Sequence, residues 1–422
     1  MKIYTLDEVV RKARQQSPFY REKYLDLPAA GWALEDLPVI DQAEFWRANS
    51  FCNNHLLTGP LEDGLVFKSG GTTGDPKFSV FTKEEWQTFT ELFGRGLLAG
   101  GLKDNERVAN IFYAGDLYAS FLFITCSLLN CPTGVLQFPI VGSTPVGEIV
   151  KLIREYQIDV LAGVPTSILA IGEYLEGDTD KSLPVRKILF GGETMYQDQR
   201  EYLARLIPGV RIASIGYASV DAGLLGYADE GCAPNEHRGF EDATILEIID
   251  EDTLCPIREA DRPGRLIVTN LTRQLMPIIR YPVGDNAEWV EAEGVGNRKF
   301  MILGRSEESA RIGPMTMYVK DIREILHTFK DKARIINFQM CVNHQDKKDT
   351  LVLRLASPTS KDVLHGLTTD IVGEIARARP MYQELVSDNK INPIVIDWIQ
   401  ERELFVNKRT GKLMMVIDKR FE

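Results

Sequence analysis

The sequence predicts an α/β fold. It comprises a large N-terminal domain with mixed and parallel sheets and helices, a β-rich subdomain within that domain, and a small α+β domain at the C-terminal end. Three observations predict this organisation. Strand-like and helix-like segments alternate between residues 144 and 215, short strand-like segments separated by turns follow Gly223, and the pattern changes once more at Gly304-Arg305. We therefore expect two domains, 1–303 and 304–422.

The first helix begins at a capping box, in which Thr5 caps the helix and Glu8 stands three residues further on. Pro18 ends this helix. A helical periodicity follows over 82–98. The longest apolar stretch, 119–129, is too short to span a bilayer and is predicted to be a buried helix.

The central region alternates in the order expected of a parallel sheet. Thr144-Pro145 places a proline at the first position of a helix. The predicted elements are strands at 108–113, 158–162, 187–190 and 210–215, with one helix at 166–175 and another that follows 191–193 and ends at Leu206. Right-handed crossovers place the carboxyl ends of such strands at one edge, where ligands bind. The segments at that edge are 163–166, 191–193 and 217–221.

Antiparallel strands are predicted after Gly223. They cover 244–250, 265–270 and 287–290, with turns at Glu251-Asp252 and Pro263-Gly264.

The composition is that of a soluble globular protein with two or more domains, since 44% of its 422 residues are hydrophobic and 26% are charged. The net charge of −11 excludes a basic nucleic-acid surface, so we expect no nucleic-acid partner. No secretory signal is recognisable, and we expect a cytoplasmic location without membrane contact. An anion site in this acidic chain needs local positive charge, for which the candidates are Lys68, Lys77, Arg280, Arg305 and Lys412.

The six cysteines are scattered, and none forms a Cys-x-x-Cys pair. Free thiols are therefore the expected state. Cys232, His237 and Cys255 could converge on a metal, but their spacing is irregular, and ordinary core or surface positions are the favoured interpretation.

The segment 68–77 reads KSGGTTGDPK and carries the strongest functional signal. Its three glycines allow the backbone to approach a ligand closely, its hydroxyl groups add donors, and Lys77 adds a point charge suited to phosphate. Backbone amides in such a loop form an anion cradle. The Walker spacing is absent, and a flexible surface loop is the alternative. We interpret the segment as the phosphate-binding loop of a nucleotide site.

Four further clusters fit a nucleotide site. They supply an aromatic ring with a carboxylate, a carboxylate beside a turn, a charged pair at the predicted hinge and a lysine on a turn, and they lie at 217–221, 280–285, 304–307 and 407–412. Each has an ordinary explanation alone, because Tyr217 could be a core residue, Asp285 the cap of a turn and Lys412 an exposed lysine. Their common order is the informative feature.

That order resembles the acyl-adenylate-forming superfamily, which includes acyl-CoA synthetases, nonribosomal adenylation domains and luciferases. Within it, the chain is most similar to the phenylacetate–CoA ligase branch, over nearly its whole length. The similar segments are 17–21, 37–40, 68–77, 191–193, 277–281, 410–412 and 416–420. The resemblance implies a mobile C-terminal domain that carries Lys412.

The resemblance implies a role for each motif. Segment 69–77 would hold the β- and γ-phosphates of ATP, Tyr217 would stack on adenine, and Asp285 would accept from both ribose hydroxyls. Asp221 would lie near Mg²⁺. The nucleotide-binding residues would be Ser69, Gly70, Gly71, Thr72, Thr73, Gly74, Gly192, Glu193, Ser214, Gly216, Tyr217, Ala218, Ser219, Asp285 and Arg305.

The catalytic residues implied in the same way are Lys412, which would bridge the substrate carboxylate and the α-phosphate, and Lys77. Glu307 would be the acidic hinge residue. The candidate substrate pocket comprises Tyr113, Tyr118, Phe138, Gly163, Pro165, Gly191 and Ala218.

The implied activity is ATP-dependent adenylation of an aromatic carboxylic acid, which yields acyl-AMP and pyrophosphate. The acyl group would then pass to CoA, to a carrier thiol or to an amine. A carboxylate has to attack an α-phosphorus that is already negatively charged, so a lysine and a metal ion are needed to offset the repulsion. The implied cofactors are ATP and Mg²⁺, with CoA if CoA is the acceptor.

The chain departs from the family pattern at several positions. Val220 stands where a threonine is usual, Asn407 and Val319 each replace a common proline, and the glycine motif around 311–314 is shifted by one residue. The shifted segment belongs to the face that forms the acceptor-thiol tunnel in relatives. Adenylation is therefore better supported than CoA transfer.

Two alternatives remain open. One is a catalytically weakened member that binds nucleotide or acyl-adenylate as a partner protein, against which the presence of Lys412 and Asp285 argues. The other is a phosphotransferase, which ranks lower because the catalytic Asp…Asn loop is missing. The sequence leaves the acid open among phenylacetate, a benzoate and a tricyclic acid, the last because of a likeness to phenazine-antibiotic tailoring enzymes. Similar enzymes are often dimers, so a homodimer is the state to test.

Overall fold

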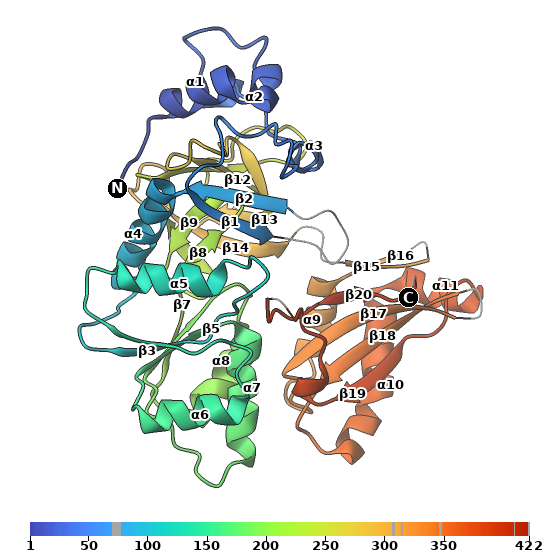
Figure 1. The fold of residues 1–422 in the computed structure, drawn as a ribbon. Coiled ribbons are helices and arrows are strands. Elements are labelled where there is room, and N and C mark those ends of the chain that lie inside the picture. Colours follow the sequence, from blue (N-terminus) through green and yellow to red (C-terminus); the bar gives the residue numbers. More distant parts are fainter. Residues whose placement is uncertain (70–76, 306–308, 314, 346–347, 409, 421–422) are drawn as a thin grey trace. The chain divides into compact units, whose positions relative to one another are not determined.

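The structure is a computed structural model that describes residues 1–69, 77–305, 309–313, 315–345, 348–408 and 410–420 (Figure 1). The chain forms two compact units. The first contains 1–167, 182–195 and 207–306, and the second contains 168–181, 196–206 and 307–422. The predicted domain boundary at 303/304 stays a prediction, because the second unit also takes two segments from the middle of the chain.

The first unit contains a five-stranded sheet in the order β4-β3-β5-β6-β7, in which every neighbouring pair is parallel. Its strands are β3 (Arg107–Asn110), β4 (Leu136–Pro139), β5 (Val160–Gly163), β6 (Lys187–Phe190) and β7 (Arg211–Ser214). β5 and β6 are buried along their whole length, as expected of interior strands that read as apolar runs. The predicted parallel sheet is confirmed.

Helices α5 (Ser120–Leu129) and α6 (Val146–Glu155) belong to the same unit. The prediction of a buried helix at 119–129 is only half right, because Leu122 and Leu129 are 37% and 72% exposed while Phe123 and Ile124 are buried. One face of α5 therefore packs inward and the other meets solvent. Among the described residues, no helix has the length and apolar character that crossing a membrane requires.

A seven-stranded antiparallel sheet follows in the order β11-β12-β13-β14-β10-β9-β8. Its strands are β8 (Tyr217–Ser219), β9 (Gly223–Tyr227), β10 (Glu236–Gly239), β11 (Thr244–Ile249), β12 (Gly264–Asn270), β13 (Tyr281–Trp289) and β14 (Lys299–Arg305). The strands predicted at 244–250 and 265–270 are confirmed. The third predicted strand begins at Tyr281 instead of 287, so it already includes Asp285.

A β-hairpin flanks the glycine-rich segment. β1 (Gly64–Ser69) and β2 (Lys77–Thr82) pair in antiparallel register, with Ser69 opposite Lys77. Thr82 then caps α4 (Lys83–Ala99) in a capping box with Glu85. The hairpin thus fixes both ends of the segment 70–76, which itself lies outside the described residues.

Within the first unit, the N-terminal region packs against residues around 276–281 through a core that includes Tyr20, Phe45, Leu56, Met276 and Tyr281. Its helices are α1 (Leu6–Gln16), α2 (Pro18–Lys23), the 3₁₀ turn η1 (Leu34–Asp36) and α3 (Gln42–Arg47). The predicted capping box at the start of α1 is present, with the Thr5 amide donating to the Glu8 carboxylate at 2.7 Å.

The second unit contains most of α7 (Pro165–Gly177), α8 (Gln197–Leu206) and the C-terminal part of the chain. That part folds as β15 (Ser309–Ile312), β16 (Met315–Tyr318), α9 (Val319–His327), β17 (Asn337–Gln345), β18 (Lys348–Ala356), α10 (Lys361–Ala378), α11 (Pro380–Ser387), β19 (Val395–Ile399), the 3₁₀ turn η2 (Glu401–Glu403) and β20 (Val416–Asp418). The strands β19-β18-β17-β20 form a mixed sheet in that order.

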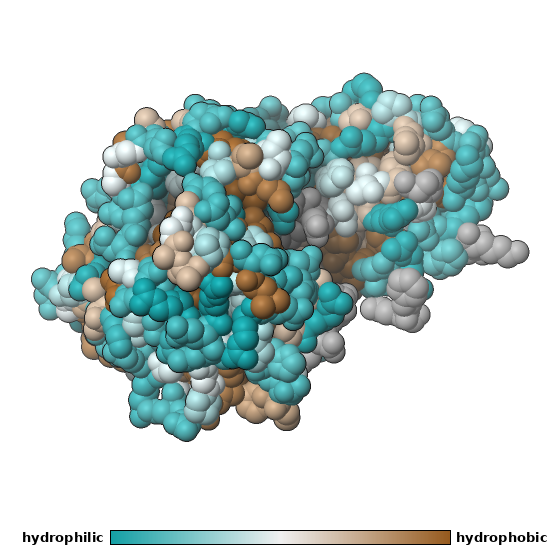
Figure 2. All heavy atoms as spheres, turned by 90° about the horizontal axis from the view of Figure 1, so that it is seen from above, coloured by the Kyte–Doolittle hydropathy of each residue, from teal (hydrophilic) through white to brown (hydrophobic). Residues whose placement is uncertain are grey.

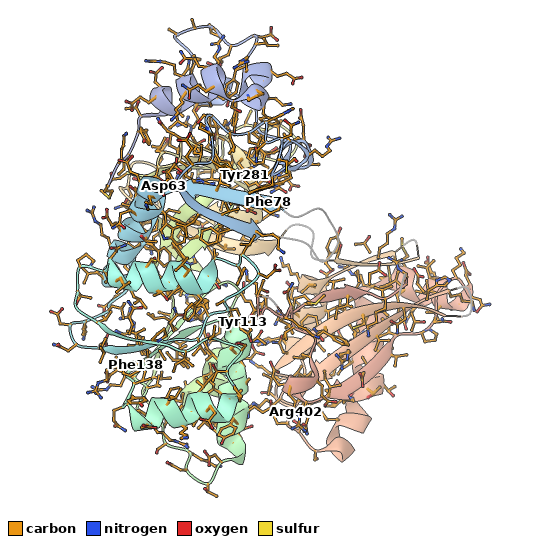
Figure 3. The ribbon with its side chains drawn as sticks, in the orientation of Figure 1. Asp63, Phe78, Tyr113, Phe138, Tyr281 and Arg402 are labelled. Atoms are coloured by element: carbon orange, nitrogen blue, oxygen red, sulfur yellow. The ribbon has the colours of Figure 1, made fainter. Side chains whose placement is uncertain are left out.

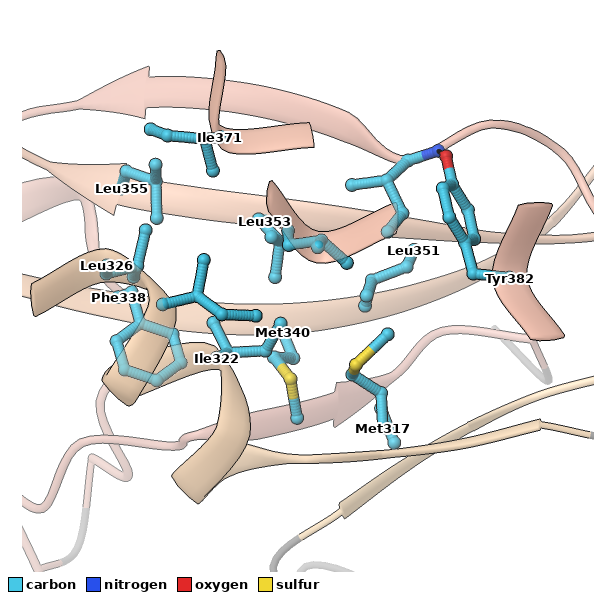
Figure 4. Packing of buried hydrophobic residues seen from close by; sticks show 14 of the residues in the cluster. Met317, Ile322, Leu326, Phe338, Met340, Leu351, Leu353, Leu355, Ile371 and Tyr382 are labelled. Atoms are coloured by element: carbon cyan, nitrogen blue, oxygen red, sulfur yellow. Dashed lines mark hydrogen bonds between the residues drawn. The ribbon is translucent and has the colours of Figure 1, made fainter. Parts of the chain in front are cut away.

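The core of the second unit lies between this sheet and its helices, where Ile322, Phe338, Met340 and Leu353 pack together (Figure 4).

On the surface of the chain, hydrophilic side chains cover most of the face shown in Figure 2, with smaller apolar areas between them.

Candidate active site

The seven-stranded sheet brings together three residues predicted to bind the nucleoside. The Tyr217 hydroxyl on β8 donates a hydrogen bond to the Asp285 carboxylate on β13. Asp285 in turn lies opposite Arg305 in the register of β13 and β14. Gly284 beside it has a φ of +91°, a conformation that favours glycine. Residues separated by up to 88 positions in the sequence (305 − 217) therefore share one place in the fold.

The turn before Tyr217 is built on Ser214, the last residue of β7. The Ser214 hydroxyl accepts a hydrogen bond from the Gly216 amide at 3.1 Å and lies 2.8 Å from Nε2 of His237. Gly216 has a φ of +126°, and a Cβ there would lie 2.9 Å from the Phe93 ring. Only glycine suits this turn, which carries the chain from the parallel sheet to β8.

His237 is a neighbour of the site whose role the sequence did not reveal. Its ring lies 5.7 Å from the Tyr217 ring and 6.0 Å from the Phe300 ring, measured between centroids. Burial lowers the pKa of His237 to about 4, so the imidazole is neutral at pH 7. An unprotonated Nε2 can accept a hydrogen bond from the Ser214 hydroxyl. The described residues contain no group of three His, Cys, Asp or Glu that could hold a metal, so Cys232, His237 and Cys255 do not converge.

The phosphate end of the predicted site lies along β2. Ser79 is two residues after Lys77 and therefore on the same face of the strand. The Ser79 hydroxyl donates to the Asp221 carboxylate at 3.0 Å. Lys77 and Asp221 are thus on one side of β2. The predicted residues Gly70, Gly71, Thr72, Thr73 and Gly74 lie outside the described residues, as does Glu307.

A buried arginine that the sequence did not single out fixes this arrangement. Arg273 is 1% exposed and donates to the carbonyls of Asp221 at 2.8 Å, Val220 at 3.3 Å and Val80 at 3.1 Å. Burial lowers its pKa to about 10, which leaves it charged at pH 7. It joins β2 to the turn that carries Asp221. Its neighbours in sequence, Thr272 and Gln274, are polar, so the local pattern does not indicate a buried charge.

Two of the predicted cations have other partners. Arg280 is 4% exposed and pairs with Glu247 at 3.0 and 2.9 Å, so the expectation that it would meet an anionic ligand is wrong. Arg280 has a φ of +43° and directly precedes Tyr281, where β13 begins. Lys68 forms an ion pair with Asp116 at 2.7 Å, which connects β1 to the loop before α5.

Several predicted pocket residues do lie at the carboxyl edge of the parallel sheet. Gly163 ends β5 and lies opposite Phe190, the last residue of β6. Gly191 follows, and a Cβ there would lie 2.6 Å from the Ile215 side chain. The Glu193 carboxylate accepts from the amide and the hydroxyl of Thr166 at 3.1 and 2.8 Å. This edge of the parallel sheet is therefore closely packed around small residues. The predicted residues Pro165 and Gly192 follow Gly163 and Gly191 in the sequence.

The two predicted aromatic residues Tyr113 and Phe138 are not brought together (Figure 3). The Tyr113 hydroxyl lies 3.4 Å from the Ser167 hydroxyl, near the start of α7. The Phe138 ring instead lies 5.4 Å from the ring of Tyr156, at the end of α6. We therefore leave Phe138 out of the pocket. Tyr118 lies in the loop before α5, where its amide donates to Gly115 at 2.9 Å.

The turn that carries Lys412 lies in the second unit. The Asn407 amide donates to the Lys412 carbonyl at 2.8 Å, and the Gly411 amide donates back to the Asn407 carbonyl at 2.8 Å. The Asn407 side chain accepts from the Thr410 amide at 3.2 Å. A proline at 407 could not donate the first of these bonds. Asn407, which stands where a proline is usual, therefore helps to close the turn.

No protein-family model matches the chain. Its sequence is similar to the phenylacetate–coenzyme A ligase of Thermus thermophilus, with 26% identity over 87% of this chain and 84% of the relative. It is similar to the enzyme of the same name from Escherichia coli, with 23% identity over 82% of this chain and 79% of the relative. A 4-chlorobenzoate–CoA ligase of a Pseudomonas strain is 23% identical over 66% of this chain and 53% of the relative.

The fold is that of solved ligases. The structure of 2-hydroxyisobutyryl-CoA ligase in the postadenylation state superposes with a TM-score of 0.77 at 16% identity, covering 98% of this chain and 88% of that one. An acyl acid amido synthetase in complex with 2,4-DB gives a TM-score of 0.68 at 14% identity, covering 94% and 85%. These neighbours confirm the predicted fold class.

The buried His237 predicts a specific loss of stability in acid. Its pKa in the folded chain, about 4, is below the ordinary value of 6.5, so the unfolded chain binds the proton more strongly between these pH values. The stability contributed by the neutral imidazole is complete above pH 6.5 and is lost as the pH falls toward 4. Between pH 7 and pH 5 the loss is about 2 kcal/mol.

Urea unfolding at both pH values tests this expectation. His237→Gln should lose about 2 kcal/mol less than the wild type on acidification. Equal losses in the two proteins would contradict the burial of a neutral His237.

Proposed function

We propose that this chain, which belongs to the acyl-adenylate-forming superfamily and to its phenylacetate–CoA ligase-like branch, activates an aromatic carboxylic acid with ATP. The products of the first step are acyl-AMP and pyrophosphate, and the acyl group then passes to a thiol. The observation that carries the proposal is the meeting of Tyr217, Asp285 and the backbone of Arg305 on the seven-stranded sheet.

The nucleoside would bind where Tyr217 and Asp285 meet. A tyrosine ring offers adenine a flat apolar face, and the Asp285 carboxylate offers two acceptor oxygens to the ribose hydroxyls. The Tyr217 hydroxyl donates a hydrogen bond to one of these oxygens. ATP binding would therefore exchange an internal hydrogen bond for bonds to ribose.

The phosphates would lie at the other end of the same site, beside Lys77 and Asp221. Mg²⁺ prefers hard oxygen ligands such as carboxylates, and Asp221 fits this preference although its side chain is one carbon shorter than the usual glutamate. The Ser79 hydroxyl and the backbone held by Arg273 orient the Asp221 carboxylate. Bound Mg²⁺ would offset negative charge on the phosphates, and Lys77 would add a second positive charge there.

Lys412 is the proposed catalytic lysine at the α-phosphate and the substrate carboxylate. The closed turn of 407–412 holds its backbone. Val319, which replaces another usual proline, is the first residue of α9. Proline suits that position only by restricting the backbone, so valine is tolerated there. Both substituted residues thus stand in regular local structure, so these two departures give no support to the weakened partner protein.

CoA is the proposed acceptor, since the similar enzymes carry CoA ligase in their names. An amine acceptor is the second candidate, because an acyl acid amido synthetase has the same fold. The aromatic acid is proposed from the relatives that act on phenylacetate and 4-chlorobenzoate. A cytoplasmic location and a homodimer stay predictions of the resemblance.

The reaction type is the first property to test. With phenylacetate, a benzoate or a tricyclic aryl acid, the protein should form AMP and pyrophosphate and no ADP. The acyl-adenylate is an activated anhydride, so hydroxylamine should trap it as a hydroxamate. Carboxylate-dependent exchange of labelled pyrophosphate into ATP is the quantitative measurement. ADP or an acyl phosphate as product would refute adenylation.

Asp285→Ala should weaken ATP binding about tenfold or more. The change leaves two ribose hydroxyls without acceptors in a partly buried site, which costs about 1–3 kcal/mol. Isothermal titration calorimetry measures the effect, with Glu288→Ala on the same strand as the control. Unchanged affinity of Asp285→Ala would remove Asp285 from the site.

Lys412→Ala should lower kcat for adenylation by about 10²- to 10³-fold, as removal of a single transition-state donor does in other enzymes. ATP affinity should change little, and thioester formation from synthetic acyl-adenylate should continue. Lys408→Ala is the matched control, because Lys408 lies on the same turn and is exposed. If both half-reactions fall together in a folded variant, the role of Lys412 is structural.

A further inference from the structure

The Lys77 side chain has a partner that the sequence did not reveal. Its ammonium lies 5.2 Å from the centroid of the Trp46 ring. This distance is within the range of a cation–π interaction, for which tryptophan is the best aromatic partner. Lys77 is the first residue of β2, directly after the glycine-rich segment. Trp46 belongs to α3, 31 positions earlier (77 − 46).

Trp46 is itself held in place. Its indole N–H donates to the Tyr281 hydroxyl at 2.9 Å, and the Gln42 side-chain amide donates to the same oxygen at 3.2 Å. The rings of Trp46 and Tyr281 pack edge to face, with centroids 6.2 Å apart. Tyr281 is 2% exposed and begins β13, the strand that carries Asp285. The indole is therefore fixed to the strand of the proposed ribose site.

The same N-terminal segment also fixes the backbone beside Lys77. The side-chain amide of Asn49, which is 5% exposed, donates to the Phe78 carbonyl at 3.0 Å and accepts from the Phe78 amide at 2.7 Å. Phe78 and Tyr281 lie in the same part of the first unit (Figure 3). Segment 42–49 thus contacts the Lys77 side chain through Trp46 and the next peptide through Asn49.

We propose that Trp46 is a positioning residue for Lys77. Its indole face holds the ammonium in a position from which it can meet the phosphates of ATP. This inference rests on the proposed function, in which Lys77 contacts those phosphates.

The choice of an aromatic ring has a physical reason. Lysine has a long, flexible stem, and ordering it on binding is unfavourable. A carboxylate partner would order the stem but would compete with phosphate for the charge, as the Lys68–Asp116 ion pair illustrates. An indole face is uncharged, so it attracts the ammonium without neutralising it. The Lys77 ammonium can then donate to phosphate oxygens while it stays over the ring.

A double-mutant cycle tests the proposal. The four proteins are the wild type, Trp46→Leu, Lys77→Met and the double variant, and the measurement is the dissociation constant of Mg-ATP by calorimetry. Trp46→Leu should weaken binding about tenfold when Lys77 is present. In the Lys77→Met background it should have little further effect, because there is no ammonium left to position.

Conservative variants separate the ring face from the volume. Trp46→Phe retains a π face and should keep most of the affinity, whereas Trp46→Met fills space without one and should behave as Trp46→Leu. Trp46→Met also serves if Trp46→Leu does not fold, and urea unfolding of each variant reports its stability.

Two results would count against different claims. If Trp46→Leu and Trp46→Met weaken binding equally in both backgrounds, Trp46 is only structural and the inference is wrong. If Lys77→Met alone binds Mg-ATP as the wild type does, the proposed contact of Lys77 with phosphate fails, and the inference falls with it.

Discussion

The phosphate end of the proposed site depends on the hydrogen bonds that the Arg273 guanidinium donates. This guanidinium is buried, and it donates to backbone carbonyls of two segments, Val80 on β2 and the Val220-Asp221 turn after β8. A buried charge is tolerated only where hydrogen bonds replace its lost hydration. Here those bonds come from the segments that carry Lys77 and Asp221. The stability of the core and the geometry of the site therefore share one set of contacts.

The arginine is supported by its own surroundings. Its guanidinium lies 4.1 Å from the Phe81 ring centroid. The next two residues, Gln274 and Leu275, donate their amides to the buried carboxylate of Glu85 at 2.7 and 2.8 Å. Glu85 also completes the capping box of α4. A chain of polar contacts thus extends from the start of α4 through Arg273 to the turn of Asp221, and an apolar replacement of Arg273 would remove its three hydrogen bonds to backbone carbonyls.

The sequence predicted well those features that are local. The capping box of α1, the parallel strands and the two turn-bounded strands after Gly223 follow from periodicity and from glycine and proline positions, which act over a few residues. Arg280 shows where such reasoning stops. Its pairing with Glu247 joins residues 33 positions apart, and nothing near Arg280 in the sequence distinguishes a buried ion pair from an anion site. The contacts of Trp46 and His237 were missed for the same reason, since their partners Lys77 and Ser214 are 31 and 23 positions away (77 − 46; 237 − 214).

To bind ATP as proposed, this acidic chain has to keep some cations available while it holds the others in its fold. The partners of the described cations distinguish those held in the fold from those available to a ligand. Arg280 is neutralised by Glu247, and Arg273 is held by carbonyls deep in the core. Lys77 is only half buried and rests on an uncharged ring. An aromatic partner orders a cation without cancelling its charge, and a carboxylate partner cancels it. The partner of each cation, more than its position in the sequence, therefore decides which of them can serve the ligand.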